Sequence, residues 1–309
     1  MGPLFQSMVT FIHLSDLHLS DPGFPGGRLL ASPKRLMAWA SWRSKKSGQH
    51  DQGLVAAAMS DLATFDPAAI LVTGDFTQLG LPCEHEQVRD WLPQLESIAP
   101  LTLVPGNHDA TAKEPWSIGL GLWRPWFGDP ENSPDSQPAF PSLRVCDEVA
   151  LIGLSSAHTS PPGFATGRVD AAQLDRLRLM LSETRTRGLF RVVFLHHPPV
   201  PDVVPWRKRL VGRKALEEVL NDVGVELLLH GHAHRSVRSS MELAGRTIPS
   251  LGAPSVSECG SRSHRGGRYQ VIGVVAEAGN WRINVRLRAW NTEAKVFVDE
   301  ERIEFEVPR

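Results

Sequence analysis

Short apolar runs that end in polar residues alternate along this chain with stretches of helical period, and no other feature restricts the possible folds as strongly. The runs are almost continuously apolar, as expected of strands that are covered on both faces. Helical periodicity fills the intervals between them. The pattern predicts an α/β fold, with strands at 9–14, 69–72, 101–104, 150–154, 192–195 and 227–229 and helices at 52–64, 83–98, 170–187 and 213–223.

The pattern changes after about residue 268, where strand-like runs at 269–276 and 281–290 are joined by a turn-like Ala-Gly-Asn sequence. This favours an antiparallel hairpin, to which 295–307 adds another strand. We expect residues 1–309 to form a single domain whose sheets are completed by the C-terminal strands from about 268. A stretch rich in Trp, Pro, Gly and Asp, at 116–141, is expected to be a long ordered loop.

Acidic and histidine-rich clusters follow five of the expected strands. In α/β folds the side chains that leave the carboxyl ends of successive strands converge on one crevice. Five clusters that are far apart in the sequence are therefore expected to meet in space. They are Asp16-Leu17-His18, Gly74-Asp75, Gly106-Asn107-His108-Asp109, His196-His197 and Gly231-His232-Ala233-His234.

These residue types suit a metal centre. Imidazole and carboxylate ligands together favour borderline cations such as manganese, iron or zinc. The three cysteines are far apart, which excludes a site built mainly from thiolates. A carboxylate can bridge two cations, and two cations about 3.5–4 Å apart can clamp a phosphoryl group and activate a water as hydroxide. Glycine before Asp75, Asn107 and His232 lets the backbone turn sharply and pass close to a ligand.

The ordered set D-x-H, GD, GNHD, H and GHxH resembles the calcineurin-like metallophosphoesterase family, and it spans residues 16–234. The resemblance implies a four-layer sandwich of two mixed β-sheets flanked by helices. It implies two divalent metal ions at the strand ends, with Asp75 as the bridge. One metal would be held by Asp16, His18, Asp75 and His234, and the other by Asp75, Asn107, His196 and His232.

The resemblance also implies that the histidine of the GNHD motif binds no metal. His108 would lie near the leaving group as a general acid or charge stabiliser, and Asp109 would fix its tautomer. The fifth cluster offers two adjacent histidines, of which only one can follow the strand's inward direction. His196 lies two residues before Pro198, as in relatives that have G-H-x-P here. We therefore place His196 in the ligand set and His197 behind it.

The expected activity is hydrolysis of a small phosphoester, and the H-H-P form of the fifth motif favours a phosphodiester, because it is similar to small bacterial phosphodiesterases. The alternatives are a lipid-linked nucleotide-sugar pyrophosphatase or a phosphomonoesterase on the same scaffold. A scaffold without catalysis is disfavoured, since every ligand position is filled. A repair nuclease is also disfavoured, because the chain has no positive surplus: 33 Lys and Arg stand against 34 Asp and Glu.

Two basic segments leave their roles open. Residues 33–46 interleave lysine and arginine with apolar residues, including Trp39 and Trp42. They could form an amphipathic element at an anionic lipid surface, a cap that grips a substrate, or an ordinary surface helix. Residues 206–214 could recruit an anion near the site or form a solvated loop.

The N-terminal sequence has neither a basic region before its apolar stretch nor an apolar run of membrane-spanning length. We expect a cytoplasmic protein, with contact to a membrane surface through 33–46 left open. The oligomeric state is not predicted by the sequence.

Overall fold

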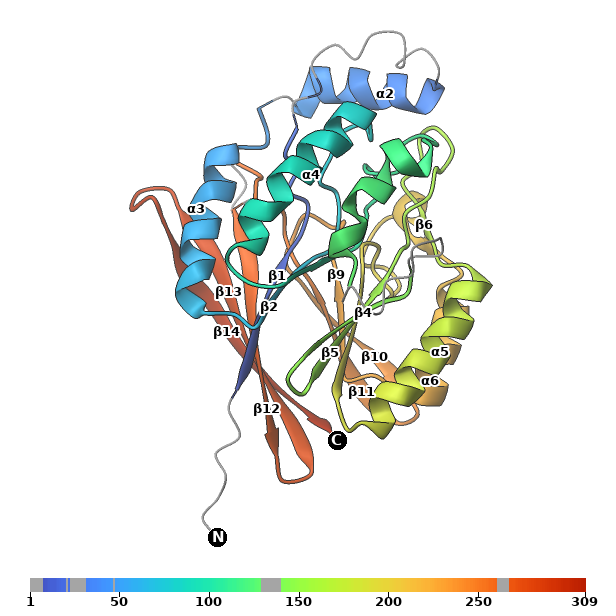
Figure 1. The fold of residues 1–309 in the computed structure, drawn as a ribbon, viewed down its shortest axis with the longest axis vertical. Coiled ribbons are helices and arrows are strands. Elements are labelled where there is room, and N and C mark those ends of the chain that lie inside the picture. Colours follow the sequence, from blue (N-terminus) through green and yellow to red (C-terminus); the bar gives the residue numbers. More distant parts are fainter. Residues whose placement is uncertain (1–7, 21, 23–31, 47, 129–139, 260–266) are drawn as a thin grey trace.

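A computed structural model describes residues 8–20, 22, 32–46, 48–128, 140–259 and 267–309. Two six-stranded β-sheets form its centre, and helices lie on the outer side of each sheet (Figure 1). Of the expected loop at 116–141, residues 129–139 lie outside the described residues. The part before them contains two short 3-10 segments, η3 (Trp116–Ile118) and η4 (Leu120–Trp126).

The first sheet has the strand order β14-β13-β12-β1-β2-β3. β1, β2 and β3 are parallel, whereas β12, β13 and β14 add to the other side of β1 through antiparallel pairs. The C-terminal strands therefore complete a sheet that begins with the first strand of the chain. The bounds are β1 (Val9–Leu14), β2 (Ala69–Val72), β3 (Leu101–Leu103), β12 (Arg268–Glu277), β13 (Asn280–Asn291) and β14 (Val296–Pro308).

The second sheet has the order β10-β11-β9-β7-β5-β4. Its inner strands are parallel, and an antiparallel strand closes each edge. The bounds are β4 (Ser142–Cys146), β5 (Val149–Leu154), β7 (Phe190–Leu195), β9 (Leu227–His230), β10 (Val237–Leu243) and β11 (Arg246–Gly252). A separate short ladder pairs β6 (Gly167–Arg168) with β8 (Leu210–Val211).

Side chains of the second sheet alternate between two hydrophobic clusters, as the two-residue period of a strand requires. In β7, Val192 and Phe194 pack in the cluster that also contains the residues of the first sheet. Val193 and Leu195 pack in the other cluster, with the helices that cover the outer face. One cluster thus fills the space between the sheets, and β7 is buried on both of its faces.

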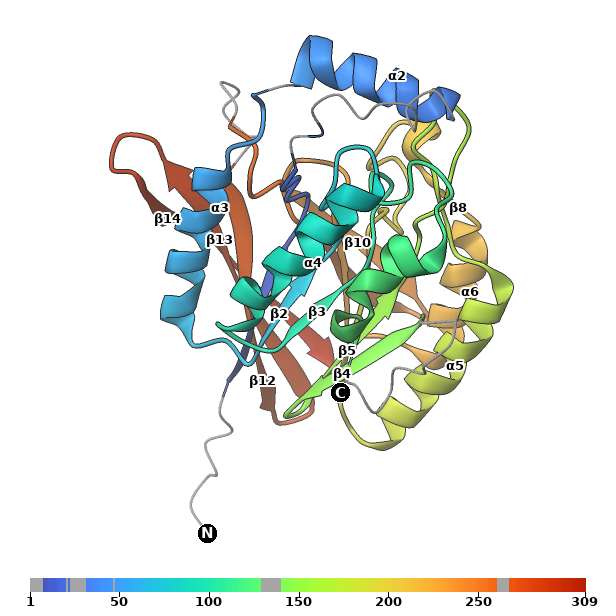
Figure 2. The same cartoon turned by 45° about the horizontal axis from the view of Figure 1, so that its top comes forward.

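Helices α3 (Gln52–Leu62) and α4 (Pro82–Glu96) cover the first sheet, and α5 (Ala171–Thr186) and α6 (Arg213–Val223) cover the second (Figures 1 and 2). The Asp51 side chain accepts a hydrogen bond from the Gly53 N–H and caps α3, and Asp170 caps α5 in the same way. A further helix, α2 (Pro33–Ser41), is continued by a π-helical turn, η1 (Trp42–Lys46).

This architecture confirms the expected fold, two mixed β-sheets flanked by helices. The sequence did not predict β4, nor the hairpin of β10 and β11, whose polar alternation resembles loop sequence. None of the helices in the described part of the chain is long and apolar enough to cross a membrane.

Candidate metal centre

The polar clusters meet at the carboxyl ends of the central strands, as the order of the strands predicts. One oxygen or nitrogen atom from each of Asp16, His18, Asp75 and His234 lies within 4.8 Å of the others. We call these four residues the first ligand group. Backbone hydrogen bonds hold the loops after β1 and β2 together, from Asp16 N to Gly74 O (2.9 Å) and from His18 N to Asp75 O (3.0 Å).

A second ligand group surrounds His196 Nε2. That nitrogen lies 3.2 Å from Asp75 Oδ2, 3.3 Å from Asn107 Oδ1 and 3.2 Å from His232 Nδ1. Asp75 therefore belongs to both groups, where a bridging carboxylate is expected. The structure brings all seven predicted metal ligands together. They come from five loops, and the first and last of them in the sequence are Asp16 and His234.

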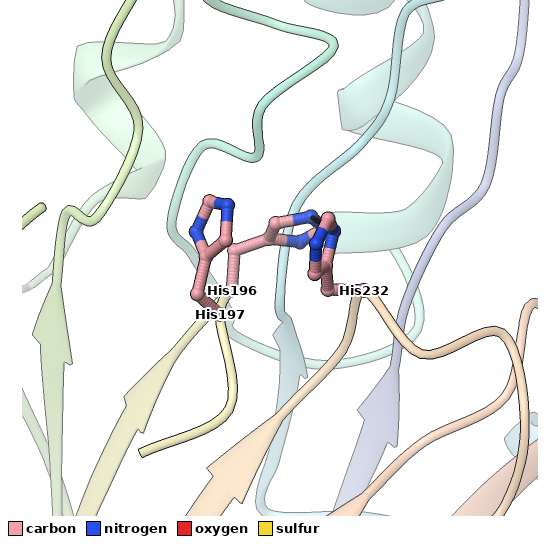
Figure 3. A group of neighbouring side chains, drawn as sticks. All are labelled: His196, His197 and His232. Carbon is pink, nitrogen blue, oxygen red and sulfur yellow. Dashed lines mark hydrogen bonds between the residues drawn. The ribbon is translucent and has the colours of Figure 1, made fainter. Parts of the chain in front are cut away.

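The choice between His196 and His197 follows from strand parity. His196 continues the series of Val192 and Phe194, which faces the first sheet, and His197 continues the outward series. His197 also uses both ring nitrogens elsewhere, with Ser156 Oγ at 2.8 Å and the Ala165 carbonyl at 3.2 Å. Its ring nevertheless lies close to those of His196 and His232 (Figure 3), and one nitrogen from each of the three rings lies within 4.8 Å of the others.

The backbone is strained where it presents the ligands. Ten non-glycine residues of the described chain have a positive φ, and five of them belong to the two ligand groups. Such conformations cost free energy and persist at sites where the surrounding structure enforces them. Those five residues are Asp16 (52°), His18 (45°), Asp75 (58°), His232 (67°) and His234 (50°).

Glycines make room for the carboxylates. A Cβ atom on Gly106 would lie 2.2 Å from Asp75 Oδ1, and one on Gly231 would lie 1.9 Å from Ser15 Oγ and 2.9 Å from Asp16 Oδ2. The glycines of the GNHD and GHxH motifs are thus required by close approach of backbone to ligand, as the sequence predicted.

Two buried carboxylate oxygens lie where a positively charged partner fits. No hydrogen bond of ordinary geometry reaches Asp16 Oδ1 or Asp75 Oδ2 from the described residues. The His234 Nε2 atom lies 3.1 Å from the first and the His196 Nε2 atom 3.2 Å from the second. An orphaned buried carboxylate oxygen is costly. A donor set of carboxylate, imidazole and amide oxygen around such atoms fits divalent cations.

The electrostatics agree with this fit. Burial lowers the pKa of His196, but the charge of Asp75 outweighs it and raises that pKa to about 9. His234 behaves in the same way beside Asp16, with its pKa also raised to about 9. The carboxylates therefore attract a positive charge strongly enough to protonate buried histidines. A metal ion would take the place of these protons and leave the rings neutral.

The histidine rings are oriented by partners on their other nitrogen. Nδ1 of His18 lies 3.0 Å from the Thr77 carbonyl, and Nδ1 of His196 lies 2.6 Å from the Thr73 carbonyl. Nδ1 of His234 lies 3.4 Å from the Glu258 carboxylate. In each case Nδ1–H donates, so the Nε2 lone pair is free to bind a metal.

The structure corrects the expectation that Asp109 fixes the tautomer of His108. His108 Nδ1 lies 2.6 Å from the Gln78 carbonyl, which fixes its tautomer. Asp109 is buried instead beneath two loops, and its carboxylate accepts five hydrogen bonds of 2.8–3.0 Å. The donors are the backbone N–H groups of Asp75, Phe76, Thr77 and Gly106 and the hydroxyl of Thr77. Asp109 thus positions the backbone that carries Asp75 and Asn107.

Sequence reasoning missed two residues at the rim of the first ligand group. The His50 ring centroid lies 4.3 Å from that of His18, and burial together with the charge of His234 lowers its pKa to about 4. Glu258 lies beside His234. The two belong to segments that meet in an isolated β-bridge, His50 to Glu258. No motif marks either residue.

The second basic segment, 206–214, lies against the second ligand group. The Lys208 carbonyl oxygen is 3.2 Å from His232 Nε2. The side chains of this segment are engaged nearby, since Arg209 stacks on the exposed ring of Trp206 and Arg213 pairs with Glu217. The Lys208 carbonyl therefore contacts the second ligand group, and the charge of Lys208 adds to burial and to the neighbouring histidines in lowering the pKa of His232.

The sequence matches the calcineurin-like phosphoesterase family over residues 9–236. The chain belongs to this family. Its members use divalent metal ions, and the two ligand groups are where the matched region would hold them.

Curated relatives in the family are named as phosphodiesterases. A "Probable cyclic nucleotide phosphodiesterase" of Synechococcus sp. is 28% identical over 209 residues, 65% of this chain and 70% of that protein. A cAMP/cGMP dual specificity phosphodiesterase of Mycobacterium tuberculosis is 31% identical over 180 residues, 56% and 51% of the two chains. The glycerophosphodiester phosphodiesterase GpdQ of Enterobacter lignolyticus is 31% identical over 135 residues, 44% and 43%.

Solved structures support the fold. A dimetal phosphatase from Danio rerio superposes with a TM-score of 0.56 at 13% identity, over 96% of this chain and 98% of that one. Purple acid phosphatase PPD1 from yellow lupin gives 0.57 at 12% identity, over 98% of this chain and 54% of the other.

Proposed function

We propose that this protein hydrolyses a phosphodiester with the help of two divalent cations held by the two ligand groups. The observation that carries the proposal is the position of Asp75, which is shared by a complete first group and a complete second group. The phosphodiesterase names of the relatives support a diester as the substrate class.

Two cations at such a site supply the positive charge that activates a water molecule and stabilises the phosphoryl group during in-line displacement. The chain contributes the geometry. Asp75 and Asn107 are held by loops that Asp109 ties together, so the ligands are preorganised before substrate arrives.

His108 is the proposed proton donor to the leaving group. It lies next to Asn107 in the chain, and its ring centroid is 5.0 Å from that of His18. The Gln78 carbonyl accepts from Nδ1–H. In the imidazolium form the second proton is on Nε2, and its transfer to the departing oxygen leaves the neutral ring with Nδ1–H still bonded to Gln78. The ring is part-buried, so a substrate oxygen can reach it.

The proposal is tested by hydrolysis of bis-p-nitrophenyl phosphate by metal-stripped protein, before and after manganese is added. We expect cleavage only after manganese is added. A protein that binds manganese and leaves the diester intact would refute the diesterase assignment. Cleavage of p-nitrophenyl phosphate or of a nucleotide-sugar pyrophosphate would then identify which alternative holds.

A further inference from the structure

The first turn of α2 is fixed to the loops that carry the ligands. Figures 1 and 2 both show α2 at the end of the molecule toward which β1 and β2 run. Arg35 is 2% exposed, donates to the carbonyls of Leu79 (3.1 Å) and Gly80 (2.7 Å), and pairs with Glu114 at 3.0 Å. Leu79 and Gly80 follow Asp75 closely in the chain. Trp39 packs against the small hydrophobic cluster of Leu79 and Leu81.

Lys34, the neighbour of Arg35, contacts the loop between β5 and β6. Its Nζ donates to Ser160 Oγ at 2.8 Å, and the buried Ser160 hydroxyl in turn donates to the Phe164 carbonyl. The loop of Ser160 contacts the GNHD segment, because the Thr159 hydroxyl donates to the Ala110 carbonyl at 3.2 Å. The ammonium group thereby joins α2 to a loop that is hydrogen-bonded to Ala110, the residue directly after the GNHD motif.

The charge of Lys34 is part-buried, and none of the described residues provides a counterion for it. Burial lowers its pKa to about 8, and the negative charge of Asp75 acts in the opposite direction. The ammonium thus lies within the electric field of the bridging carboxylate. Among the residues that the structure describes, no carboxylate forms an ion pair with it. A part-buried ammonium whose partner is a neutral hydroxyl keeps an uncompensated charge, and an anion bound in the site would offset that cost.

We propose that Lys34 binds an anionic oxygen of the substrate's phosphoryl group above the metal centre. This inference rests on the proposed function, because it assigns the anion to the substrate of that same site. It gives a role to the basic segment at 33–46: α2 is a cap, anchored by Arg35, that presents one cation to the substrate. Two apolar side chains of α2, Leu36 and Met37, are exposed. Contact of this helix with a membrane surface stays a prediction.

The test uses inorganic phosphate as the probe and the full-length chain loaded with manganese. Lys34→Ala should weaken phosphate binding in calorimetry about 10-fold or more, as expected for a lost charge-assisted hydrogen bond. Lys34→Arg should retain most of the affinity. Arg43→Ala is the matched control, since Arg43 is exposed on the adjoining turn and stacks on Trp39. It should bind phosphate as the wild type does, and all three variants should keep the wild-type manganese content.

Kinetics with bis-p-nitrophenyl phosphate give a second measurement. Lys34→Ala should raise KM more than it lowers kcat. Because burial lowers the pKa of Lys34 below its ordinary value, KM of the wild type should rise at alkaline pH as Lys34 loses its proton, and Lys34→Arg should not show this rise. If Lys34→Ala lowers the melting temperature, the comparison of Lys34→Arg with Lys34→Gln carries the test, because both retain a long side chain.

Phosphate affinity of Lys34→Ala within two-fold of the wild type would overturn the inference. So would an equal loss in Arg43→Ala, which would show a general effect of surface charge. A wild-type protein that cleaves no diester and still binds phosphate through Lys34 would refute the proposed function alone.

Discussion

Replacement of Asp109 by Asn separates the two roles that this residue could have. The change keeps the shape of the side chain but removes one acceptor oxygen. In the structure Oδ1 accepts three hydrogen bonds and Oδ2 accepts two, from Asp75 N and Gly106 N. In either orientation the Asn amide group faces at least two donors. Two buried donors without acceptors cost about 2–6 kcal/mol in total.

We therefore expect Asp109→Asn to lower the free energy of unfolding of the metal-free protein by about 2–6 kcal/mol and to reduce manganese binding. Denaturant unfolding at pH 8 measures the first effect, since burial and the charge of Asp75 raise the pKa of Asp109 to about 7 and the carboxylate is mostly ionised there. Elemental analysis measures the second. His108→Ala is the control, because it leaves the five hydrogen bonds intact.

Wild-type stability and full metal content in Asp109→Asn, together with slow turnover, would refute this reasoning. That result would restore the role suggested by family resemblance, in which Asp109 acts on the His108 ring.

Three further predictions concern the ligands and the buried histidines. Asp75→Asn should remove bound metal from both groups and abolish turnover, so retention of two metal ions and activity would contradict the bridging role. His108→Ala should keep both metal ions and slow diester hydrolysis about 100-fold or more; an empty site in this variant would make His108 a ligand. His13, held between Gln270 and Thr73, has its pKa lowered by burial from 6.5 to about 3. Below pH 6.5 the unfolded chain therefore binds a proton at His13 that the folded chain does not. Each further pH unit of acidification then lowers the free energy of unfolding by about 1.4 kcal/mol. His13→Gln should show a shallower loss of stability between pH 6.5 and 5 in denaturant titrations, and identical slopes would exclude His13 as the source.

The sequence was informative where a local pattern has one structural meaning. Apolar runs between polar clusters predicted the central strands, and the clusters predicted the ligands, because the carboxyl ends of parallel strands share an edge. The two-residue period of the strand allowed only one of His196 and His197 to point inward, and the position of Pro198 indicated His196. These features can be read from a few neighbouring residues.

Other features depend on contacts between distant segments and have no local signal. The hairpin of β10 and β11 turns at Ala244 and Gly245, both with positive φ, and only β10, where exposed and buried residues alternate, lies at the edge of the sheet. His50 and Glu258 approach the metal centre only because their segments form a bridge across about 200 residues. The five donors to Asp109 come from loops that are separate in the sequence, so the motif alone suggested a different partner.

The pairing of β1 has a consequence for how the chain folds during synthesis. β1 lies in the middle of its sheet, and one of its two neighbours is β12, where Val9 pairs with Val274. At 5–20 residues per second a ribosome needs roughly 13–50 s to make the intervening chain. Throughout that time an apolar strand that includes Phe11 and Ile12 has an open edge, which invites chaperone binding or aggregation. All seven metal ligands emerge before β12 does, so early metal capture by the nascent chain would precede completion of the sheet that supports it.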